Sequence, residues 1–465
     1  MSSCVSPPAW EQRHLRDFVT KLVDGSHNPP AKQEAGHPML SARNVEQGRI
    51  VFEGFRFISN EAFVIENART RIAPGDVLLT IVGTIGRSAV VPEGIGPFAL
   101  QRSVAVLAPK PDLLPKFLSY QLQSPRIQRH FEANARGTAQ KGVYLKTLGE
   151  TPIVVPPLGE QRDLVAEIEK QFSRLDEALA GLKRVKANLK RYKAAILKAA
   201  VEGRLVPTEA NLARRESRKY ADGGQLLAGM IQERQAHRTG KGKKSDAIAP
   251  KTAGLSELPI GWAWASVEEL GRLQLGRQRA PKYHSGPNMR PYLRVQNVFE
   301  DRIDLSDVME MDFSKADFER FVLHTGDILL NEGQSPELLG RPAMYRGEMP
   351  GVCFTNTLIR FQAYRCVLPE FALIVFRHYM HAGRFVDESN ITTNIAHLSL
   401  GRLSTVEFPV PPLSEQHRIV AEVDRLLSIA RETEAEVESN LKRAQSLRQA
   451  ILSKAFMTDH GMSPI

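Results

Sequence analysis

The residues of this chain that could take part in catalysis do not form an active-site motif. Asn28-Pro29-Pro30 begins like the Asn-Pro-Pro-aromatic motif that holds an amine for methyl transfer, but Ala31 follows it and no glycine-rich cofactor strand precedes it. The segment Gly94-Ile-Gly-Pro-Phe-Ala99 fits a loose G-x-G-x-x-A pattern, yet a proline stands where a phosphate-binding helix should begin. We interpret both segments as turns.

Phosphate-binding, nuclease and metal motifs are missing from the sequence as well. The Gly-Lys pairs at 240 and 242 lack the partner glycine of a phosphate loop, and Pro111-Asp112 is not continued as in a nuclease centre. His378 and His381 lie on a helix expected over 371–381, without cysteine or carboxylate at metal-ligand spacing. The sequence therefore predicts a protein that is not an enzyme and that has no metal or cofactor of its own.

The clearest pattern is a long internal repeat. Pro156-Pro-Leu-Gly-Glu-Gln161 returns as Pro411-Pro-Leu-Ser-Glu-Gln416, and a register of 255 residues holds to the Ala-Ile-Leu segments that end with Leu197 and Leu452. Apolar residues recur at steps of three and four through both copies, which is typical of a helix that packs lengthwise on one partner. We expect spacer helices over 156–204 and 411–460.

The charges of the two helices predict how they pair. The first has six acids and three bases over 160–177, then seven bases and no acid over 183–198. The second has six acids and two bases over 422–438, then Lys442, Arg443, Arg448 and Lys454 with no acid. Opposite charges meet in both halves only if the helices are antiparallel. The helix dipole alone would favour such a polarity only in the terminal turns.

The composition limits the class of protein to which the chain can belong. At 465 residues it exceeds one compact core, and its hydrophobic content of 42% supports globular domains. The net charge of +10 favours a polyanionic partner. Three cysteines without a pairing pattern fit a reducing compartment, and no segment has the features of a signal peptide or membrane span. We expect a soluble, cytoplasmic protein.

Two domains with mixed strands and helices precede the helices. Residues 1–155 contain short β-like runs at 48–52, 75–82, 88–91 and 103–107, and a helix is expected over 114–131. Residues 256–410 repeat them loosely: Gly75-Asp76-Val-Leu-Leu79 returns as Gly326-Asp327-Ile-Leu-Leu330. The predicted fold class is α+β, with two repeated α+β domains separated by two long antiparallel coiled-coil helices in a pseudo-twofold arrangement. Residues 205–255, with ten bases and four acids over 211–251, are expected to form a flexible basic linker.

The order of these segments resembles the specificity subunit of type I restriction-modification enzymes over nearly the whole chain. The resemblance rests on the Gly-Asp-Val/Ile-Leu-Leu strands, Asp24-Gly-Ser-His-Asn-Pro-Pro30, Leu258-Pro-Ile-Gly-Trp262, the Val-Pro-Pro-Leu-x-Glu-Gln helix starts and the Ala-Ile-Leu helix ends. It implies that 1–155 and 256–410 are target-recognition domains, each of which reads one half of a split, asymmetric DNA site.

The resemblance also implies the partners. The helices would act as a spacer and as a docking surface for two modification subunits, which bring S-adenosylmethionine and methylate adenine. Restriction subunits would add ATP- and Mg-dependent translocation and cleavage. No part of that chemistry is expected in this chain, and no membrane is involved.

Base readout needs polar or basic side chains on loops that can enter a groove of double-stranded DNA. In the first domain the candidates are Ser26, His27, Asn28, Arg43, Asn44, Thr84, Arg87, Gln101, Arg102, Thr138, Gln140 and Lys141. In the second they are Arg277, Arg279, Arg294, Gln296, Asn297, Asn331, Gln334, Arg341, Thr355, Asn356, Thr392, Thr393 and Asn394.

Pairs of candidates that correspond in the two domains carry further information. Asn44 and Asn297 are the same residue in domains expected to read different sequences, so a turn or hydrogen-bonding role is also open for them. Ser26 and Arg277 differ, as do Arg102 and Asn356, which is the pattern expected of specificity residues. Two other functions stay open: an enzyme with an unrecognised motif, and an adaptor whose helices bind proteins while its domains do not touch DNA.

Overall fold

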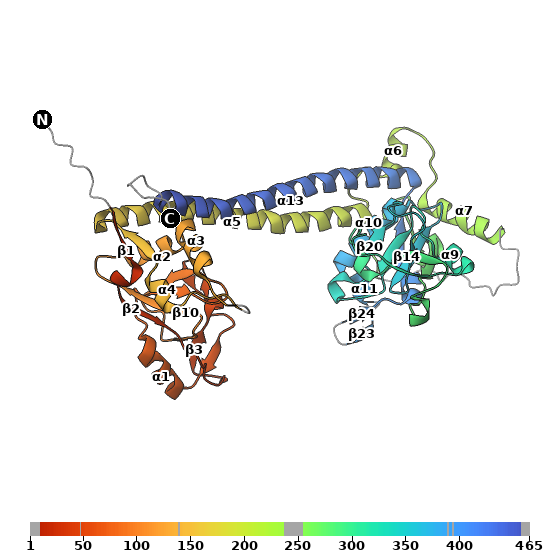
Figure 1. Cartoon of the computed structure of the whole chain (residues 1–465). Coiled ribbons are helices and arrows are strands. Elements are labelled where there is room, and N and C mark those ends of the chain that lie inside the picture. The colour runs from red at the N-terminus through yellow and green to blue at the C-terminus, as the bar shows by residue number, and fades with distance from the viewer. Residues whose placement is uncertain are drawn as a thin grey trace. The chain divides into compact units, whose positions relative to one another are not determined.

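The structure is a computed structural model that describes residues 10–46, 48–137, 140–236, 254–387, 390–392 and 395–456 (Figure 1). The chain divides into two compact units. The first contains Met1–Arg184 with Val437–Ile465, and the second contains Val185–Glu436. Each unit holds one α+β domain together with parts of the two long helices. Among the described residues, no helix is long and apolar enough to cross a membrane.

The two predicted long helices are present as α5 (Leu158–Val201) and α13 (Leu413–Phe456). In the first unit Arg448 of α13 donates to Asp176 of α5 at 3.1 Å, and Lys454 lies close enough to Glu167 to lower the pKa of that carboxyl, whose larger influences are Gln171 and Lys170. The numbers rise along one helix as they fall along the other, so the pair is antiparallel, as the charges predicted.

The first domain is built on a four-stranded antiparallel sheet in the order β2-β10-β7-β8. A second sheet places β3 between β6, which is antiparallel to it, and β9, which is parallel. The strands are β1 (Glu11–His14), β2 (Val19–Asp24), β3 (His37–Leu40), β4 (Val45–Glu46), β5 (Arg49–Ile50), β6 (Arg56–Ile58), β7 (Val77–Thr80), β8 (Ser88–Val90), β9 (Ala99–Leu100), β10 (Val104–Pro109) and β11 (Pro152–Val155). The helices are η1 (Leu15–Asp17), η2 (Ala42–Asn44), α1 (Asn60–Thr70), α2 (Pro115–Leu122), α3 (Pro125–Asn134) and α4 (Leu145–Gly149).

The single helix expected over 114–131 is wrong, because the structure has two helices there. The first, α2, ends at Leu122, and α3 starts at Pro125. A proline disfavours the helical conformation in the residue before it, so Ser124 adopts extended angles and breaks the helix.

The second domain repeats this topology in its own unit, with the sheet β13-β22-β18-β20 and with β14 between β17 and β21. The strands are β12 (Ala263–Ser266), β13 (Gly271–Leu275), β14 (Met289–Leu293), β15 (Val298–Phe299), β16 (Arg302–Ile303), β17 (Met309–Asp312), β18 (Ile328–Asn331), β19 (Gly333–Gln334), β20 (Pro342–Met344), β21 (Cys353–Phe354), β22 (Leu358–Ala363), β23 (Asn390–Thr392), β24 (Ile395–His397) and β25 (Glu407–Val410). The helices are α8 (Val267–Leu270), η3 (Pro281–Tyr283), η4 (Val295–Asn297), α9 (Lys315–Phe321), η5 (Pro336–Leu338), α10 (Pro369–Ala382), α11 (Arg384–Asp387) and α12 (Leu400–Ser404). The repeated α+β fold is therefore confirmed.

The repeated Glu-Gln pair joins each domain to its helix. The amide of Gln161 donates to the Asp112 and Pro156 carbonyls and accepts the Leu114 N–H, at 2.8 Å each. Gln416 does the same with Leu368, Cys366 and Pro411 at 2.8 to 3.0 Å. The glutamate of each pair accepts an indole N–H, from Trp10 at 2.9 Å in the first unit and from Trp262 at 3.0 Å in the second.

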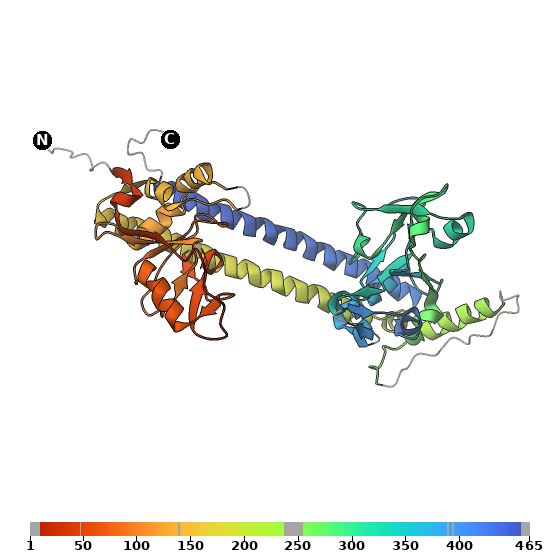
Figure 2. The ribbon, with the colours of Figure 1, turned by 60° about the horizontal axis from the view of Figure 1, so that its bottom comes forward.

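The first domain lies against the ends of the two long helices in its unit (Figure 2), and apolar packing fixes it there. Ile168 and Phe172 of α5 and Leu452 and Phe456 of α13 belong to the same buried cluster as the β7 and α2 side chains. The ring of Phe456 meets that of Phe117 edge-on at 5.4 Å. Because buried apolar area and buried hydrogen bonds act together here, we expect each domain to be held rigidly on its part of the helices.

The expectation of a flexible linker over 205–255 is wrong for 209–236, which contain α6 (Glu209–Arg215) on the start of α13 and α7 (Gly223–Ala236) on the second domain. Glu209 is 1% exposed and pairs with Arg218 at 2.5 Å and Arg418 at 2.7 Å. Met230 of α7 joins the buried cluster of the second domain. The basic run over 238–251 lies outside the described residues. Composition suggested solvation, but buried ion pairs and a few apolar contacts are enough to fix this segment.

Candidate nucleic-acid interface

In the first domain, backbone hydrogen bonds bring three of the predicted loops to one edge. Ser26, after β2, donates its N–H to Leu100 at 2.8 Å and accepts the Arg102 N–H at 2.8 Å. Gln101 donates its N–H to Leu40 at the end of β3, at 2.9 Å. The segments 26–28, 41–44 and 101–103 are therefore neighbours.

The second domain repeats this edge with other residues. Arg277 donates its N–H to Phe354 and accepts the Asn356 N–H, both at 3.0 Å, and Thr355 donates its N–H to Leu293 at 3.0 Å. Gly276 precedes this contact as Gly25 does in the first domain. A Cβ at either glycine would lie 2.2 to 2.3 Å from a carbonyl oxygen, so no side chain fits there.

A second pair of loops continues the edge. In the first domain the Ile81 N–H binds the Ser103 carbonyl at 2.9 Å, and Val143 donates to Ile81 at 2.8 Å. These bonds place 82–87 and 140–142 beside 101–103. In the second domain Glu332 corresponds to Ile81. Its N–H donates to the Thr357 carbonyl at 3.0 Å, and its carbonyl accepts the Leu398 N–H at 2.8 Å. Each domain thus presents one continuous row of loops, called here the loop edge.

The loop edge exposes some of the predicted side chains to solvent. In the first domain the exposed candidates are His27, Asn28, Arg43, Thr84, Arg102, Gln140 and Lys141, with Arg87 and Gln101 half-buried. In the second domain they are Arg279, Gln296 and Asn356, with Arg294, Gln334 and Arg341 half-buried. Two of the latter are already engaged: Arg294 pairs with Asp307 at 2.6 Å, and Arg341 stacks on Phe299 at 4.9 Å.

Asn44 and Asn297 are corrections to the predicted set, because both side chains are buried and engaged. The Asn44 amide donates to the Val51 and Glu53 carbonyls at 2.9 and 2.8 Å. The Asn297 amide donates to the backbone carbonyls of Asp304 and Asp307 at 3.0 and 2.9 Å. Both close the turn after η2 or η4, which is the structural role that their identity suggested.

Four further candidates are also covered. Ser26 donates its hydroxyl to Glu66 of α1 at 2.8 Å. Arg277 is 8% exposed and pairs with Asp317 of α9 at 3.0 Å, between the rings of Tyr283 and Phe313. The Thr355 hydroxyl donates to Leu293, and Asn331 is fully buried. The difference between Ser26 and Arg277 therefore reflects packing against two different helices and not solvent-facing readout.

The remaining candidates cannot be placed. Thr138, Thr393 and Asn394 lie outside the described residues, and of Thr392 only the backbone, in β23, is described. Sequence reasoning also missed three basic side chains of the second domain, Lys282, Arg290 and Arg320, each of which stacks on an aromatic ring. The signal that could have found the first two is a stretch of five bases without an acid over 277–294.

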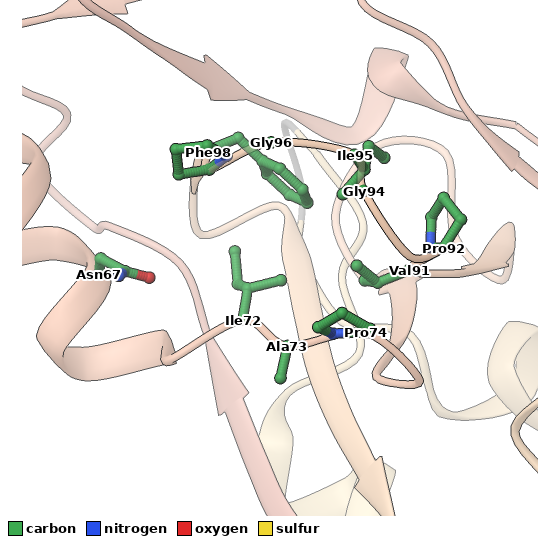
Figure 3. A pocket seen from close by; sticks show the side chains of 11 residues that line it. Asn67, Ile72, Ala73, Pro74, Val91, Pro92, Gly94, Ile95, Gly96 and Phe98 are labelled. Atoms are coloured by element: carbon green, nitrogen blue, oxygen red, sulfur yellow. The ribbon is translucent and has the colours of Figure 1, made fainter.

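The described residues contain no group of three or more histidine, cysteine, aspartate or glutamate side chains that could hold a metal ion. A cavity of about 260 Å³ in the first domain is lined by Ile72, Pro74, Val91, Phe98 and their neighbours, with the Asn67 amide as its one polar side chain (Figure 3). Gly94 and Gly96 stand there with φ of 72° and 76°, so the Gly-rich segment is a turn as predicted. This lining offers no acid, base or nucleophile.

Known proteins share this architecture. The family model described as type I restriction modification DNA specificity domain matches residues 7–191 and 261–443. The EcoKI specificity subunit of Escherichia coli K12 is 22% identical over 90% of this chain and 81% of its own length, and the StySPI specificity subunit of Salmonella potsdam is 21% identical over the same shares.

Solved structures agree at the level of the fold. The HsdS subunit from Thermoanaerobacter tengcongensis has a TM-score of 0.54 at 19% identity, over 99% of this chain and all of its own. A chain from a study of complex assembly in a type I restriction-modification system has a TM-score of 0.63 at 20% identity, over 97% and 99%.

Each of the two regions matched by the family model contains one α+β domain and most of the long helix that follows it. The chain belongs to the type I restriction modification DNA specificity family. It is the specificity subunit of a type I restriction-modification system, and it acts in DNA recognition and not in catalysis.

Proposed function

We propose that each domain reads one half of a split, asymmetric site in double-stranded DNA through its loop edge. The observation that carries this proposal is the repeat of one backbone frame with different exposed side chains. Arg102 in the first domain corresponds to Asn356 in the second, and Arg43 corresponds to Gln296. A guanidinium pairs best with guanine and a side-chain amide with adenine, so the two edges are suited to different bases.

The revised set of base-contacting residues contains the side chains that solvent reaches. We retain His27, Asn28, Arg43, Thr84, Arg87, Gln101, Arg102, Gln140 and Lys141 in the first domain, and Arg294, Gln296, Gln334, Arg341 and Asn356 in the second, and we assign exposed Arg279 to contacts with the DNA backbone. Asn44, Asn297, Ser26, Arg277, Thr355 and Asn331 are excluded because their side chains are buried.

The helices are proposed to dock two modification subunits and, through them, restriction subunits. Large apolar side chains that solvent reaches support this role: Val185 and Tyr192 on α5, and Ile429 and Leu447 on α13, are 42 to 52% exposed. S-adenosylmethionine, ATP and Mg would belong to those partners, which would methylate adenine and cleave DNA. Because its ligand would be chromosomal DNA, we place the protein in the cytoplasm.

The experiment co-expresses the chain with its modification subunits and maps adenine methylation at single-base resolution. We expect a motif with two short defined halves around a fixed gap. Arg102→Ala should relax positions in one half only, and Asn356→Ala positions in the other, each by about 1 to 3 kcal/mol of discrimination. Relaxation of both halves by one substitution would contradict the assignment. A stable complex that neither methylates nor binds DNA would favour the adaptor role.

A further inference from the structure

The two domains differ sharply in charge along one corresponding stretch. Between Arg277 and Arg294 the second domain has five arginines or lysines and no acid, a formal charge of +5. The corresponding stretch of the first domain runs from Ser26 to Ser41 and has one base, Lys32, and one acid, Glu34, which sum to zero. The ends of both stretches are fixed by the same backbone contacts, so the two stretches correspond as whole segments.

Three of the five bases point to solvent without a carboxylate partner. Arg279 and Lys282 follow β13, and Arg290 lies on β14. Within the part of the chain that the structure describes, none of the three makes an ion pair. Each lies instead against an aromatic ring. The ring centroid of Tyr292 is 5.7 Å from the Arg279 guanidinium, that of Tyr283 is 4.9 Å from the Lys282 ammonium, and that of Phe318 is 4.8 Å from the Arg290 guanidinium.

Arg277, whose side chain is buried beneath these three bases, stabilises the segment that carries them. It donates to the Asp312 carbonyl, pairs with Asp317 and stacks on Tyr283 at 4.0 Å. Asp312 in turn accepts the Asn288 N–H at 2.7 Å, which closes the loop after η3. Asp312 and Asp317 are thus occupied by internal contacts and do not neutralise the three outer bases. Aromatic stacking restricts the long side chains, so less conformational entropy is lost when they bind.

We propose that Arg279, Lys282 and Arg290 form a phosphate-binding patch, so that the second domain supplies an affinity for DNA backbone that the first domain lacks. The patch continues the loop edge, because Arg277 is bonded to Asn356 and Tyr292 precedes Leu293 and Arg294 at the end of β14. Unpaired cations at that place suit phosphate oxygens, and contacts to phosphate position a protein without reading sequence. This inference rests on the proposed function and adds residues that act on affinity and not on specificity.

The corresponding region of the first domain is built differently. There Ser26 is tied to Glu66 of α1, and Arg69 of α1 is neutralised by Asp24 at 2.5 Å. Solvent-facing Val64 and Ile65 of α1 are 66 and 71% exposed. An apolar helix face beside paired charges does not attract phosphates, so the first domain depends on its loop edge alone.

The test compares two triple variants of the full chain in complex with its modification subunits. The first carries Arg279→Gln, Lys282→Gln and Arg290→Gln. The control carries Arg214→Gln, Arg215→Gln and Lys219→Gln, which remove the same charge from exposed positions in and after α6. Binding is measured by fluorescence anisotropy with a duplex that contains the mapped methylation motif and with a scrambled duplex of equal length, over a series of KCl concentrations.

We expect the first variant to lose about tenfold to hundredfold in affinity for both duplexes, with the slope of log K against log salt reduced by about 2 to 3. The methylation motif should not change, and the control should bind as the unaltered chain does. Arg279→Lys with Arg290→Lys keeps the charges and should retain the salt slope, which separates phosphate binding from a folding defect.

Three results would overturn the patch: an unchanged salt slope, an equal loss in the control variant, or a loss confined to the duplex with the motif. A different result would sink the proposed function itself. In that case the unaltered complex would bind neither duplex at any salt concentration, and the variants would show no difference to interpret.

Discussion

The two α+β domains share one backbone fold, but different side chains stabilise it. In both, a buried aspartate follows the glycine of the Gly-Asp segment, and Asp76 and Asp327 are each 4% exposed. Asp76 pairs with Lys21 of β2 at 2.6 Å, whereas Asp327 pairs with Arg360 of β22 at 3.3 Å. The two corresponding aspartates are thus neutralised by bases on strands that do not correspond. Backbone bonds fix the frame, so a side-chain partner can move without changing the fold.

The largest expected effect tests this exchange of partners. Arg360 is 3% exposed and also donates to Gln274 at 2.6 Å and to the Val322 carbonyl at 2.8 Å. Arg360→Ala removes all of these contacts and leaves Asp327 as an unpaired buried charge, so we expect a loss of about 3 to 5 kcal/mol in the free energy of unfolding. Urea denaturation followed by circular dichroism measures it.

Lys21→Ala is the matched substitution in the first domain. The Lys21 side chain is 21% exposed, so water replaces part of what it provides to Asp76. We expect a loss of about 1 to 2 kcal/mol. If both variants lost the same free energy, the two aspartates would be equally dependent on their partners, and the comparison drawn here would be wrong.

The next prediction concerns acid sensitivity. Burial and then the charges of Lys198 and His381 lower the pKa of His378 to about 4. The corresponding residue of the first domain, counted from the proline that starts each helix, is Ser124. As the pH falls, the unfolded chain takes up a proton near pH 6.5 while folded His378 stays neutral. The stability that neutral His378 provides is therefore complete above about pH 6.5 and is lost down to about pH 4, by about 3 kcal/mol.

His378→Asn should flatten this part of the curve of stability against pH, measured by urea denaturation between pH 7 and pH 4. His130 of the first domain also has a lowered pKa, from burial and then from Arg126. We expect His130→Asn to flatten the curve less, because burial is the main cause of the lowered pKa at both histidines and is greater for His378. If the stability of His378→Asn still fell steeply between pH 7 and pH 4, the assignment would be wrong.

The sequence predicted the parts of this molecule that rest on periodicity and charge. Long apolar repeats and blocks of charge extend over many turns, so the two helices and their antiparallel pairing could be inferred without coordinates. Single local signals were weaker. Pro125 breaks a helix that apolar spacing made continuous, and Glu209 forms buried ion pairs within a segment whose composition suggested a solvated linker.

The loop edges could be located from sequence, but their exposed members could not be selected. Residue type does not tell whether an asparagine faces DNA or caps a turn, and Asn44 and Asn356 have opposite exposures. A difference between the two domains was no better guide, since Ser26 and Arg277 differ because α1 and α9 present them with different partners. The lack of acids between Arg277 and Arg294 was visible in the sequence, yet the stacking that orders those bases needs three-dimensional neighbours.

The smallest expected effect concerns the ion pairs between the helices. In the first unit, Arg448 of α13 pairs with Asp176 and also lies 4.0 Å from the centroid of the Phe172 ring. In the second, Lys193 pairs with Glu434, whose side chain is 32% exposed. Asp176 is 61% exposed, so water screens its charge, and Asp176→Asn should cost about 0.5 kcal/mol or less. Arg448→Ala should cost about 1 to 2 kcal/mol, since it also removes the stacking on Phe172.

Reversal of both charges in one pair, Asp176→Arg with Arg448→Asp, separates electrostatics from packing. If charge alone held the helices together, the double variant would regain the stability of the unaltered chain. We expect it to regain only the small electrostatic part, because aspartate cannot cover the Phe172 ring as arginine does. Full recovery in urea denaturation would show that the charge pattern carries the stability of the pair. Partial recovery would show that apolar contacts provide most of the stability of the pair.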